Sequence, residues 1–316
     1  MDRLKAFASS SFSTVLACVG FFLLATIPLY VNPYLVILLT TVLMYIALTL
    51  SWAIFSGPTR YISLASAAFF GVGAYSSAVM GQVLPLFLVI VAGGLVSLIL
   101  AFLMGFLTLR LRGMYFIIFT FGVSELIRHF LLWWETNMKG TVGRFVVSVD
   151  PTTVYYIMLV IFAVALLTAF LIGRSRFGLA LRSIGEHEEA ALHIGIHVTW
   201  LKTAAFAVSA FFMGASGATM ATRWTYIDPS IAFNPLFSFM PVLMAIFGGI
   251  GQLYGPILGA TIFALIEEVL ITRFPYYYML SFGIILVVVV VFLPKGLIGL
   301  IEKSWKTGVK GIHAAG

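Results

Sequence analysis

The residues best suited to do chemistry lie in one charged stretch of an otherwise apolar chain, RSRFGLALRSIGEHEEAALHIGIHVTWLK at 174–202. Glu186, Glu188 and Glu189 open a short segment rich in alanine and leucine, and negative charge is favourable at a helix N-terminus. Gly195 can end this segment in a left-handed cap. The stretch therefore predicts a short helix between two apolar segments, which is either a solvated connection or a docking element for a cytoplasmic partner.

Three histidines in the same stretch raise the question of a metal site. His193 and His197 are four residues apart, on one potential helix face, and His187 is close in sequence. A zinc site would need a third ligand of suitable geometry, and the chain has no HExxH motif. A single cysteine, Cys18, permits no internal disulfide and no multi-cysteine site. We expect this chain to bind no metal and no cofactor.

A second group of ionisable residues lies within an apolar segment. Glu125 and Arg128 are three residues apart, so their side chains can pair on one helix face, and His129 follows directly. A charge at membrane depth costs about 2.5–3.5 kcal/mol on insertion scales and marks a functional site by default. The pair is either neutralised near the outer interface or lines a substrate path.

Glycines form the third dense cluster, FGGIGQLYGPILGA at 247–260. Gly255 and Gly259 make a GxxxG face that favours close helix packing, and Pro256 suits the first turn of a helix. Packing is one interpretation of this cluster. The other is a hinge or gate formed by Gly248, Gly249 and Gly251.

The chain has no means of using ATP itself. A P-loop needs a lysine directly after a glycine to hold the nucleotide phosphates, and the sequence contains no Gly-Lys pair. We therefore expect no enzymatic activity. Energy for any transport must come from an ion gradient or from a partner subunit.

Composition places these residues in a membrane protein. Of 316 residues, 62% are hydrophobic and 9% charged, whereas soluble domains have about 25% charged residues. The net charge of +7 does not indicate nucleic-acid binding, because the basic residues are distributed between apolar segments. The predicted fold is an all-α polytopic membrane protein.

Apolar runs divide the chain into about ten predicted spans, or eight if two are re-entrant. Each membrane-spanning helix needs roughly 20 apolar residues. The third and eighth runs are short and contain glycine, so they are the two that could be re-entrant. The ten runs are 12–30, 33–55, 62–80, 85–109, 114–133, 152–173, 200–222, 234–249, 253–271 and 276–293.

The distribution of positive charge predicts the orientation. With ten spans, thirteen of the eighteen Lys and Arg residues fall on one side of the membrane, and cytoplasmic loops carry the excess of positive charge. Both termini are then cytoplasmic. The first run lacks a cleavage pattern, so we interpret it as a retained signal-anchor helix.

Taken together, the motifs resemble the M-type permease subunits of branched-chain amino-acid ABC importers. Four blocks match that family in order over about residues 57–300. They are GPTRYISLASAAFFGVGAY at 57–75, LRLRGMYFIIFTFGVSELIR at 109–128, SRFGLALRSIGEHEEAALHIGI at 175–196 with LKTAAFAVSAFFMGASGA at 201–218, and FGGIGQLYGPILGA at 247–260 with LPKGLIGL at 293–300. Nothing divides the chain into two domains, so we predict a single permease domain spanning 1–316.

This resemblance implies a coupling role for the charged stretch. Glu189-Ala190-Ala191 followed by Gly195 is similar to the EAA-xxx-G loop of ABC importers, which fits a groove on a cytoplasmic ATPase. The implied partners are two such ATPases, which bind the ATP, a second homologous permease subunit and a periplasmic binding protein, in a bacterial inner membrane. The implied coupling residues are Arg182, Glu186, Glu188, Glu189, Ala190, Ala191 and Gly195.

One segment departs from the family pattern. Between Trp134 and Pro151, where the family tends to have a glycine-rich TGG-type segment, this chain has ETNMKGTVGRFVVSVD. The family architecture also serves urea, amides and aromatic acids. We therefore predict an importer subunit for branched-chain amino acids or related small solutes. The alternative, which Glu125 and the two short runs favour, is a stand-alone ion-coupled carrier or channel.

Overall fold

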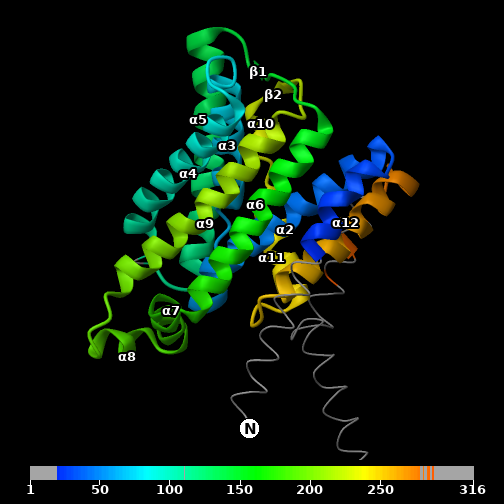
Figure 1. Cartoon of the computed structure of the whole chain (residues 1–316). Coiled ribbons are helices and arrows are strands. Elements are labelled where there is room, and N and C mark those ends of the chain that lie inside the picture. The colour runs from blue at the N-terminus through cyan, green and yellow to red at the C-terminus, as the bar shows by residue number, and fades with distance from the viewer. Residues whose placement is uncertain (1–19, 110, 278–279, 281–282, 285–286, 288–316) are drawn as a thin grey trace, which may run out of the picture.

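Long apolar segments form helices in the computed structural model, which describes residues 20–109, 111–277, 280, 283, 284 and 287 (Figure 1). Pro33 and Pro151 each occupy the first position of a long helix, where a missing amide hydrogen costs nothing. Asp150 caps the second of these helices by accepting hydrogen bonds from the backbone N–H groups of Thr152 and Thr153. The helices are η1 (Ile27–Leu29), α2 (Pro33–Thr59), α3 (Ser66–Met80), α4 (Leu86–Thr108), α5 (Met114–Trp134), the π-helix η2 (Glu135–Lys139), α6 (Pro151–Arg174), α7 (Arg176–Glu186), α8 (Glu188–His193), α9 (Val198–Ala221), α10 (Pro229–Ala232), α11 (Leu236–Gly248) and α12 (Gly255–Arg273).

The bundle has two distinct ends. At one end, α7 and α8 lie beside the connections that follow α2 and α4 (Figure 1). At the other end, the short strands β1 (Arg144–Phe145) and β2 (Tyr226–Ile227) pair antiparallel, with Arg144 opposite Ile227. We call these the α7–α8 end and the β1–β2 end.

The predicted division of positive charge agrees with these two ends. Arg112, Arg182 and Lys202 lie at the α7–α8 end, where each contacts or belongs to the α7–α8 region. Arg144 lies at the β1–β2 end. These four residues thus lie at the ends that the positive-inside rule predicts, whereas the orientation in a membrane and the side of the termini stay predictions.

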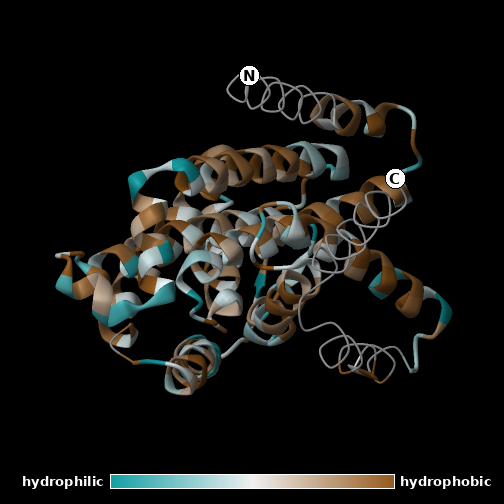
Figure 2. Ribbon diagram, turned by 90° about the horizontal axis from the view of Figure 1, so that it is seen from below, coloured by the Kyte–Doolittle hydropathy of each residue, from teal (hydrophilic) through white to brown (hydrophobic). Residues whose placement is uncertain are grey.

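Helix α9 lies at the centre of the bundle and packs against α2, α3 and α4. It is the most buried of the long helices, whereas α5 is largely uncovered. Hydrophobic residues cover the helices, and hydrophilic residues gather at connections and helix ends (Figure 2). Large exposed apolar side chains such as Leu107, Met114 and Leu126 are what a lipid-facing surface requires.

Seven helices among the described residues are long and apolar enough to cross a membrane. They match seven of the ten predicted spans. Two further predicted spans are shorter helices: α3 has 15 residues, and Gly20–Leu29 is the described part of the first run. The tenth run, 276–293, lies mostly outside the described residues, so the count of ten stays a prediction.

The two runs predicted to be irregular do form short helices. Helix α3 has 15 residues, below the roughly 20 residues of a full span, whereas α11 has 13 but follows α10, and Pro229–Gly248 together have 20 residues. Whether either segment is re-entrant stays a prediction. Most of α3 is buried, and an irregular stretch at 61–65 precedes it. Irregular backbone at membrane depth is tolerated where protein surrounds it.

Glycines let α3, α4 and α9 approach closely. A Cβ atom on Gly73 would overlap the carbonyl group of Gly214, and a Cβ atom on Gly214 would overlap the side chain of Ser97. Ser97 donates a hydrogen bond to the carbonyl oxygen of Phe69 across the same contact, at 2.9 Å. Small residues that bring helix backbones together are typical of membrane helix packing.

Replacing Gly73 with valine should therefore disrupt this contact. We expect G73V to lower the thermal melting temperature of the detergent-purified protein, because overpacking costs about 1–3 kcal/mol and here the obstacle is backbone. The matched control is G122V on α5, where a Cβ atom meets nothing within 4 Å. Equal melting temperatures for G73V and G122V would show that the contact is looser than described.

Candidate functional site

The charged stretch forms a helical hairpin at the end of the bundle. Ser175 caps α7 by accepting a hydrogen bond from the backbone N–H of Gly178 at 3.2 Å. Glu186 ends α7, and α8 begins at Glu188. The prediction that Glu186 opens the short helix is therefore wrong. Glu186 is the last residue of α7, and only Glu188 and Glu189 lie in the first turn of α8.

Gly195 ends α8 in the predicted left-handed conformation, with φ of 85°. The N–H of Gly195 bonds to the carbonyl of Leu192, and the N–H of Ile196 bonds to that of Ala191. These two bonds form a Schellman motif, in which glycine avoids the steric cost of positive φ. The next helix, α9, begins at Val198, so the predicted loop 174–202 is shorter than expected and Lys202 belongs to α9.

Glu188 is the centre of a polar cluster that we call the Glu188 cluster, formed by Glu188, Lys202, Tyr61 and Arg112. Lys202 Nζ lies 2.9 Å from Glu188 Oε1, and its side chain is 1% exposed. Tyr61 donates a hydrogen bond to Glu188 Oε2 at 2.6 Å. Arg112 Nη2 is 3.8 Å from the same carboxylate. A buried lysine is stable here because it is paired and hydrogen-bonded.

The cluster alters the ionisation of its members. Burial acts to raise the pKa of Glu188, but hydrogen bonds from Tyr61 and Lys202 and the charges of Lys202 and Arg112 outweigh it and hold that pKa below its ordinary value. Burial, followed by the hydrogen bond to Glu188, raises the pKa of the Tyr61 hydroxyl. Glu188 is thus a carboxylate and Tyr61 a neutral donor at neutral pH.

Through this cluster, the hairpin is tied to several helices at once. Lys202 is on α9 and also donates to the carbonyl oxygen of Leu109, which follows α4, at 3.1 Å. Tyr61 follows α2, and Arg112 precedes α5. Gly185 adds a backbone contact, because a Cβ atom there would overlap the carbonyl of Pro58. A displacement of the hairpin would therefore pull on the ends of four long helices.

The outer surface of the hairpin combines carboxylates with apolar side chains. Glu189 is 78% exposed and pairs with Arg112 at 3.1 Å, and Glu186 and Ala190 are also exposed. Leu192 and Ile194 are 51% and 74% exposed. Ala191 faces inward and is buried. Of the predicted coupling residues, Glu186, Glu189, Ala190 and Gly195 are exposed here, and Arg182 is exposed on another side of α7, whereas Glu188 is half-buried.

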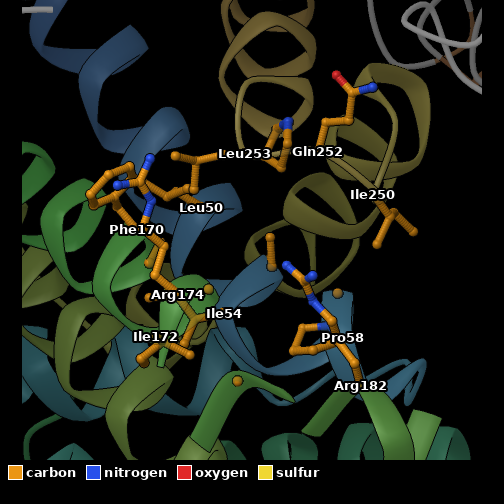
Figure 3. Close-up of a pocket in the computed structure, with 17 residues that line it drawn as sticks. Leu50, Ile54, Pro58, Phe170, Ile172, Arg174, Arg182, Ile250, Gln252 and Leu253 are labelled. Atoms are coloured by element: carbon orange, nitrogen blue, oxygen red, sulfur yellow. The ribbon is translucent and has the colours of Figure 1, made fainter. Parts of the chain in front are cut away.

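Arg182 lies apart from this surface. It lines a cavity with Pro58 and Arg174, on the side of α7 that faces α2 and α6 (Figure 3). Its predicted contact with a partner stays a prediction, whereas its position places it beside the connection between α11 and α12.

The pair predicted on α5 is present. Arg128 Nη2 lies 2.6 Å from Glu125 Oε2, and each side chain is 24% exposed. His129 Nε2 is 3.7 Å from the same carboxylate. The arginine balances the Glu125 charge, as the neutralised interpretation requires. A role in the substrate path stays a prediction for both residues.

The glycine cluster has three different local roles. A Cβ atom on Gly248 would overlap Gly255, and one on Gly259 would overlap the carbonyl of Met244, so α11 and α12 pack backbone to backbone. Gly249 has φ of 107° and makes the turn after α11. Gly251 lines the cavity beside Arg182. Packing is thus confirmed for the GxxxG face, and gating stays a prediction for Gly248, Gly249 and Gly251.

The sequence analysis missed a buried carboxylate at the β1–β2 end. Glu135 is 2% exposed and accepts hydrogen bonds from the Gly143 N–H at 2.7 Å and the Tyr75 hydroxyl at 3.3 Å. Arg144 Nε lies 3.3 Å from its other oxygen. No helical spacing links Glu135 to Arg144, because the π-helix and a turn separate them. Their closeness in sequence was the only available signal.

Removing this carboxylate should loosen the loop at 135–150. We expect E135A to destabilise the protein by about 1–3 kcal/mol, because a buried N–H and a guanidinium lose their acceptor. The measurement is the melting temperature in detergent, together with protease cleavage within the loop. M138A, which shortens a 61% exposed side chain of the same loop, is the control. An E135A melting temperature equal to that of M138A would contradict the assignment.

No three His, Cys, Asp or Glu side chains gather in a way that could hold a metal ion within the part of the chain that the structure describes. The coupling role of the α7–α8 hairpin stays a prediction. The hairpin has an exposed outer surface and an ion-paired, buried inner surface.

Comparison with known proteins identifies the family of the chain. A family model described as "branched-chain amino acid transport system / permease component" matches residues 34–290. The high-affinity branched-chain amino acid transport system permease protein LivM of Salmonella typhimurium is 28% identical over 304 residues, which is 84% of this chain and 70% of that protein. LivM of Escherichia coli is 27% identical over the same shares.

A third relative matches over a shorter range. The permease protein BraD of Pseudomonas aeruginosa, which also carries the description high-affinity branched-chain amino acid transport system, is 27% identical over 158 residues, or 48% of this chain and 50% of that protein. No solved structure matches the chain significantly.

Proposed function

The chain belongs to the family of branched-chain amino acid transport permeases, and from that premise we propose that it imports branched-chain amino acids or related small organic solutes when partner ATPases act on its α7–α8 hairpin. It is the permease subunit of an importer and a multi-pass protein of the bacterial inner membrane. The hairpin supplies the means by which a subunit without a P-loop responds to ATP.

The Glu188 cluster is the observation that carries the coupling proposal. A docking element transmits force only if its inner face is fixed to the parts that must move. The buried pair of Glu188 with Lys202 fixes α8 to α9, the helix at the centre of the bundle. Gly185 fixes α7 to the end of α2 through a backbone contact.

Transmission then follows from rigid-body movement of packed helices. When two ATPases close around ATP, each permease hairpin seated on them is displaced, and α9 and α2 follow because they are bonded to it. Packed helices respond by switching between discrete arrangements. In this scheme the two arrangements are the outward-facing and inward-facing states of the pathway, and ATP is bound only by the partners.

The uncovered helices are available for the remaining partners. Helix α5 is the least buried of the long helices, so in the membrane its surface meets lipid or the second, homologous permease subunit. The pathway forms between the two permeases, with the Glu125–Arg128 pair beside it. A periplasmic binding protein delivers the solute at the β1–β2 end, where the loop at 135–150 departs from the family pattern.

The competing function is a carrier or channel that works alone. The intramembrane Glu125 favours it, because ion-coupled carriers keep ionisable residues in their helices. The geometry of the pair weakens this alternative, since Arg128 already neutralises that carboxylate at 2.6 Å. Ion coupling requires a group that can gain and lose charge during the cycle.

Reconstitution distinguishes the two functions. In proteoliposomes we expect the subunit alone to show no leucine flux in a proton or sodium gradient. We expect uptake only when the second permease, both ATPases, the binding protein and ATP are present. Uptake driven by an ion gradient in the absence of partners would establish the carrier and refute the importer proposal. If the complete complex hydrolyses ATP and transports another small solute but no leucine, only the substrate assignment is wrong.

A further inference from the structure

A cavity of about 290 Å³ lies where α2, α6 and α7 meet the connection between α11 and α12 (Figure 3). None of the roles assigned above uses it. The residues that line it are apolar in one part and basic in another. Leu50, Ile54 and Phe170 come from within the long helices α2 and α6, and Arg174 and Arg182 come from the end of α6 and from α7.

Two arginines without a carboxylate partner frame the cavity. Both side chains extend into the space between their helices and the 250–253 segment (Figure 3). Neither forms an ion pair with an acidic residue among those described, while the Arg174 guanidinium stacks on the Phe170 ring at 4.2 Å. Stacking leaves the edge of a guanidinium free for bidentate bonds to phosphate or carboxylate.

The cavity is therefore apolar inside the helical bundle and cationic at the α7–α8 end. Inorganic phosphate or a nucleotide would bind the arginines, but it would make no contact suited to the apolar wall beside Leu50 and Ile54. An anionic amphiphile uses both parts. Basic pockets between transmembrane helices at the cytoplasmic surface bind the head groups of anionic lipids.

We propose that this cavity binds an anionic phospholipid of the cytoplasmic leaflet. The lipid phosphate lies between Arg174 and Arg182 and accepts hydrogen bonds from their guanidinium groups. One acyl chain follows the wall formed by Leu50, Ile54 and Phe170. The inference rests on the membrane placement of the helices and is independent of which solute is transported.

Such a lipid would contact the hairpin and the rest of the bundle together. Arg182 belongs to α7, Arg174 to α6, and Gly251 and Gln252 to the connection that leads into α12. The bound lipid thus joins the coupling hairpin to the α11–α12 pair, which the Glu188 cluster does not reach. This gives Arg182 a role different from direct contact with an ATPase.

Native mass spectrometry of the detergent-purified full chain tests the proposal. The protein is titrated separately with phosphatidylglycerol, phosphatidylcholine and inorganic phosphate. We expect wild type to bind phosphatidylglycerol at least about tenfold more tightly than phosphatidylcholine, because each arginine beside an anionic head group contributes about fivefold in affinity. The R174Q/R182Q double variant should lose this preference. R176Q, which removes an exposed arginine of α7 that does not line the cavity, should keep it.

Three results would overturn the lipid site. They are equal binding of the two lipids by wild type, a preference retained by R174Q/R182Q, and binding of inorganic phosphate with no preference for the anionic lipid. The melting temperature of each variant in detergent micelles shows whether a loss of binding is caused by misfolding. If R174Q/R182Q is unstable, the single variants R174Q and R182Q are titrated instead, and each should lose about fivefold.

Discussion

Charge reversal at Glu186 and Glu189 together is expected to reduce ATP-driven uptake at least about tenfold while leaving the protein inserted in the membrane. Both carboxylates lie on the outer surface of the α7–α8 hairpin, and Glu189 also pairs with Arg112. Like charges brought together at an interface cost several kcal/mol, and each 1.4 kcal/mol is a factor of ten in affinity. The E186K/E189K complex should therefore hydrolyse ATP without coupled uptake.

The measurement is solute uptake and ATP hydrolysis on the same proteoliposomes, with the amount of inserted subunit determined in parallel. E186Q/E189Q is the matched control, because it removes the charges without reversing them and should impair uptake less. Uptake at the wild-type level in E186K/E189K would mean that the exposed hairpin surface does not couple the ATPases to the permease.

Loss of Lys202 is expected to have the largest effect on stability. K202M removes the ammonium group that lies 2.9 Å from Glu188 inside the protein. Breaking a buried ion pair by removing one partner costs about 3–5 kcal/mol. Because Glu188 is partly exposed and keeps the Tyr61 hydrogen bond and Arg112 at 3.8 Å, the loss should lie at the lower end of that range or below it. We expect a clearly lower melting temperature, easier proteolysis between α7 and α9, and loss of uptake.

A double variant separates the ion pair from the packing of the lysine side chain. In K202M/E188Q no charge is left unpaired, so part of the lost stability should return. The E188Q variant alone completes the cycle. If K202M melts at the wild-type temperature, or if K202M/E188Q is as unstable as the sum of the single variants, the Glu188 cluster does not hold the hairpin.

The apolar helices were the most predictable part of the fold. A run of about 20 apolar residues has few alternatives to a membrane helix, and α2, α4, α5, α6, α9 and α12 fall close to their predicted ranges. The start of α3 was less predictable, because the predicted run begins at 62 and the helix begins at Ser66. Its start depends on what surrounds it, as in the irregular stretch at 61–65, where the Leu64 N–H donates to Thr120 Oγ1.

The hairpin was predictable where its signals are local. Gly195 ends α8 as expected, because positive φ is a property of a few adjacent residues. Glu186 was misplaced by one helix, since three nearby carboxylates give no sign of which one begins a helix. The Ser175 cap and the break at His187 decide this locally.

Contacts between distant residues were not predictable. Lys202 was counted as a loop charge of the cytoplasmic side, yet its amine is buried against Tyr61, which is 141 positions away in the sequence. Glu135 gave no periodic signal either. Each becomes recognisable only when the helices are placed, because burial turns an ordinary charged residue into one that requires a partner.

Site-specific photo-crosslinking from the hairpin tests whether α8 docks on an ATPase subunit. A benzophenone side chain is placed at Leu192, which is 51% exposed on α8, in cells that express the complete transporter. The account predicts an adduct with the ATPase subunit that changes in yield between ATP-bound and ATP-free states. The same probe at Met138, exposed at the β1–β2 end, should give no ATPase adduct. An ATPase adduct from position 138, or none from position 192 in a complex that hydrolyses ATP, would contradict the account.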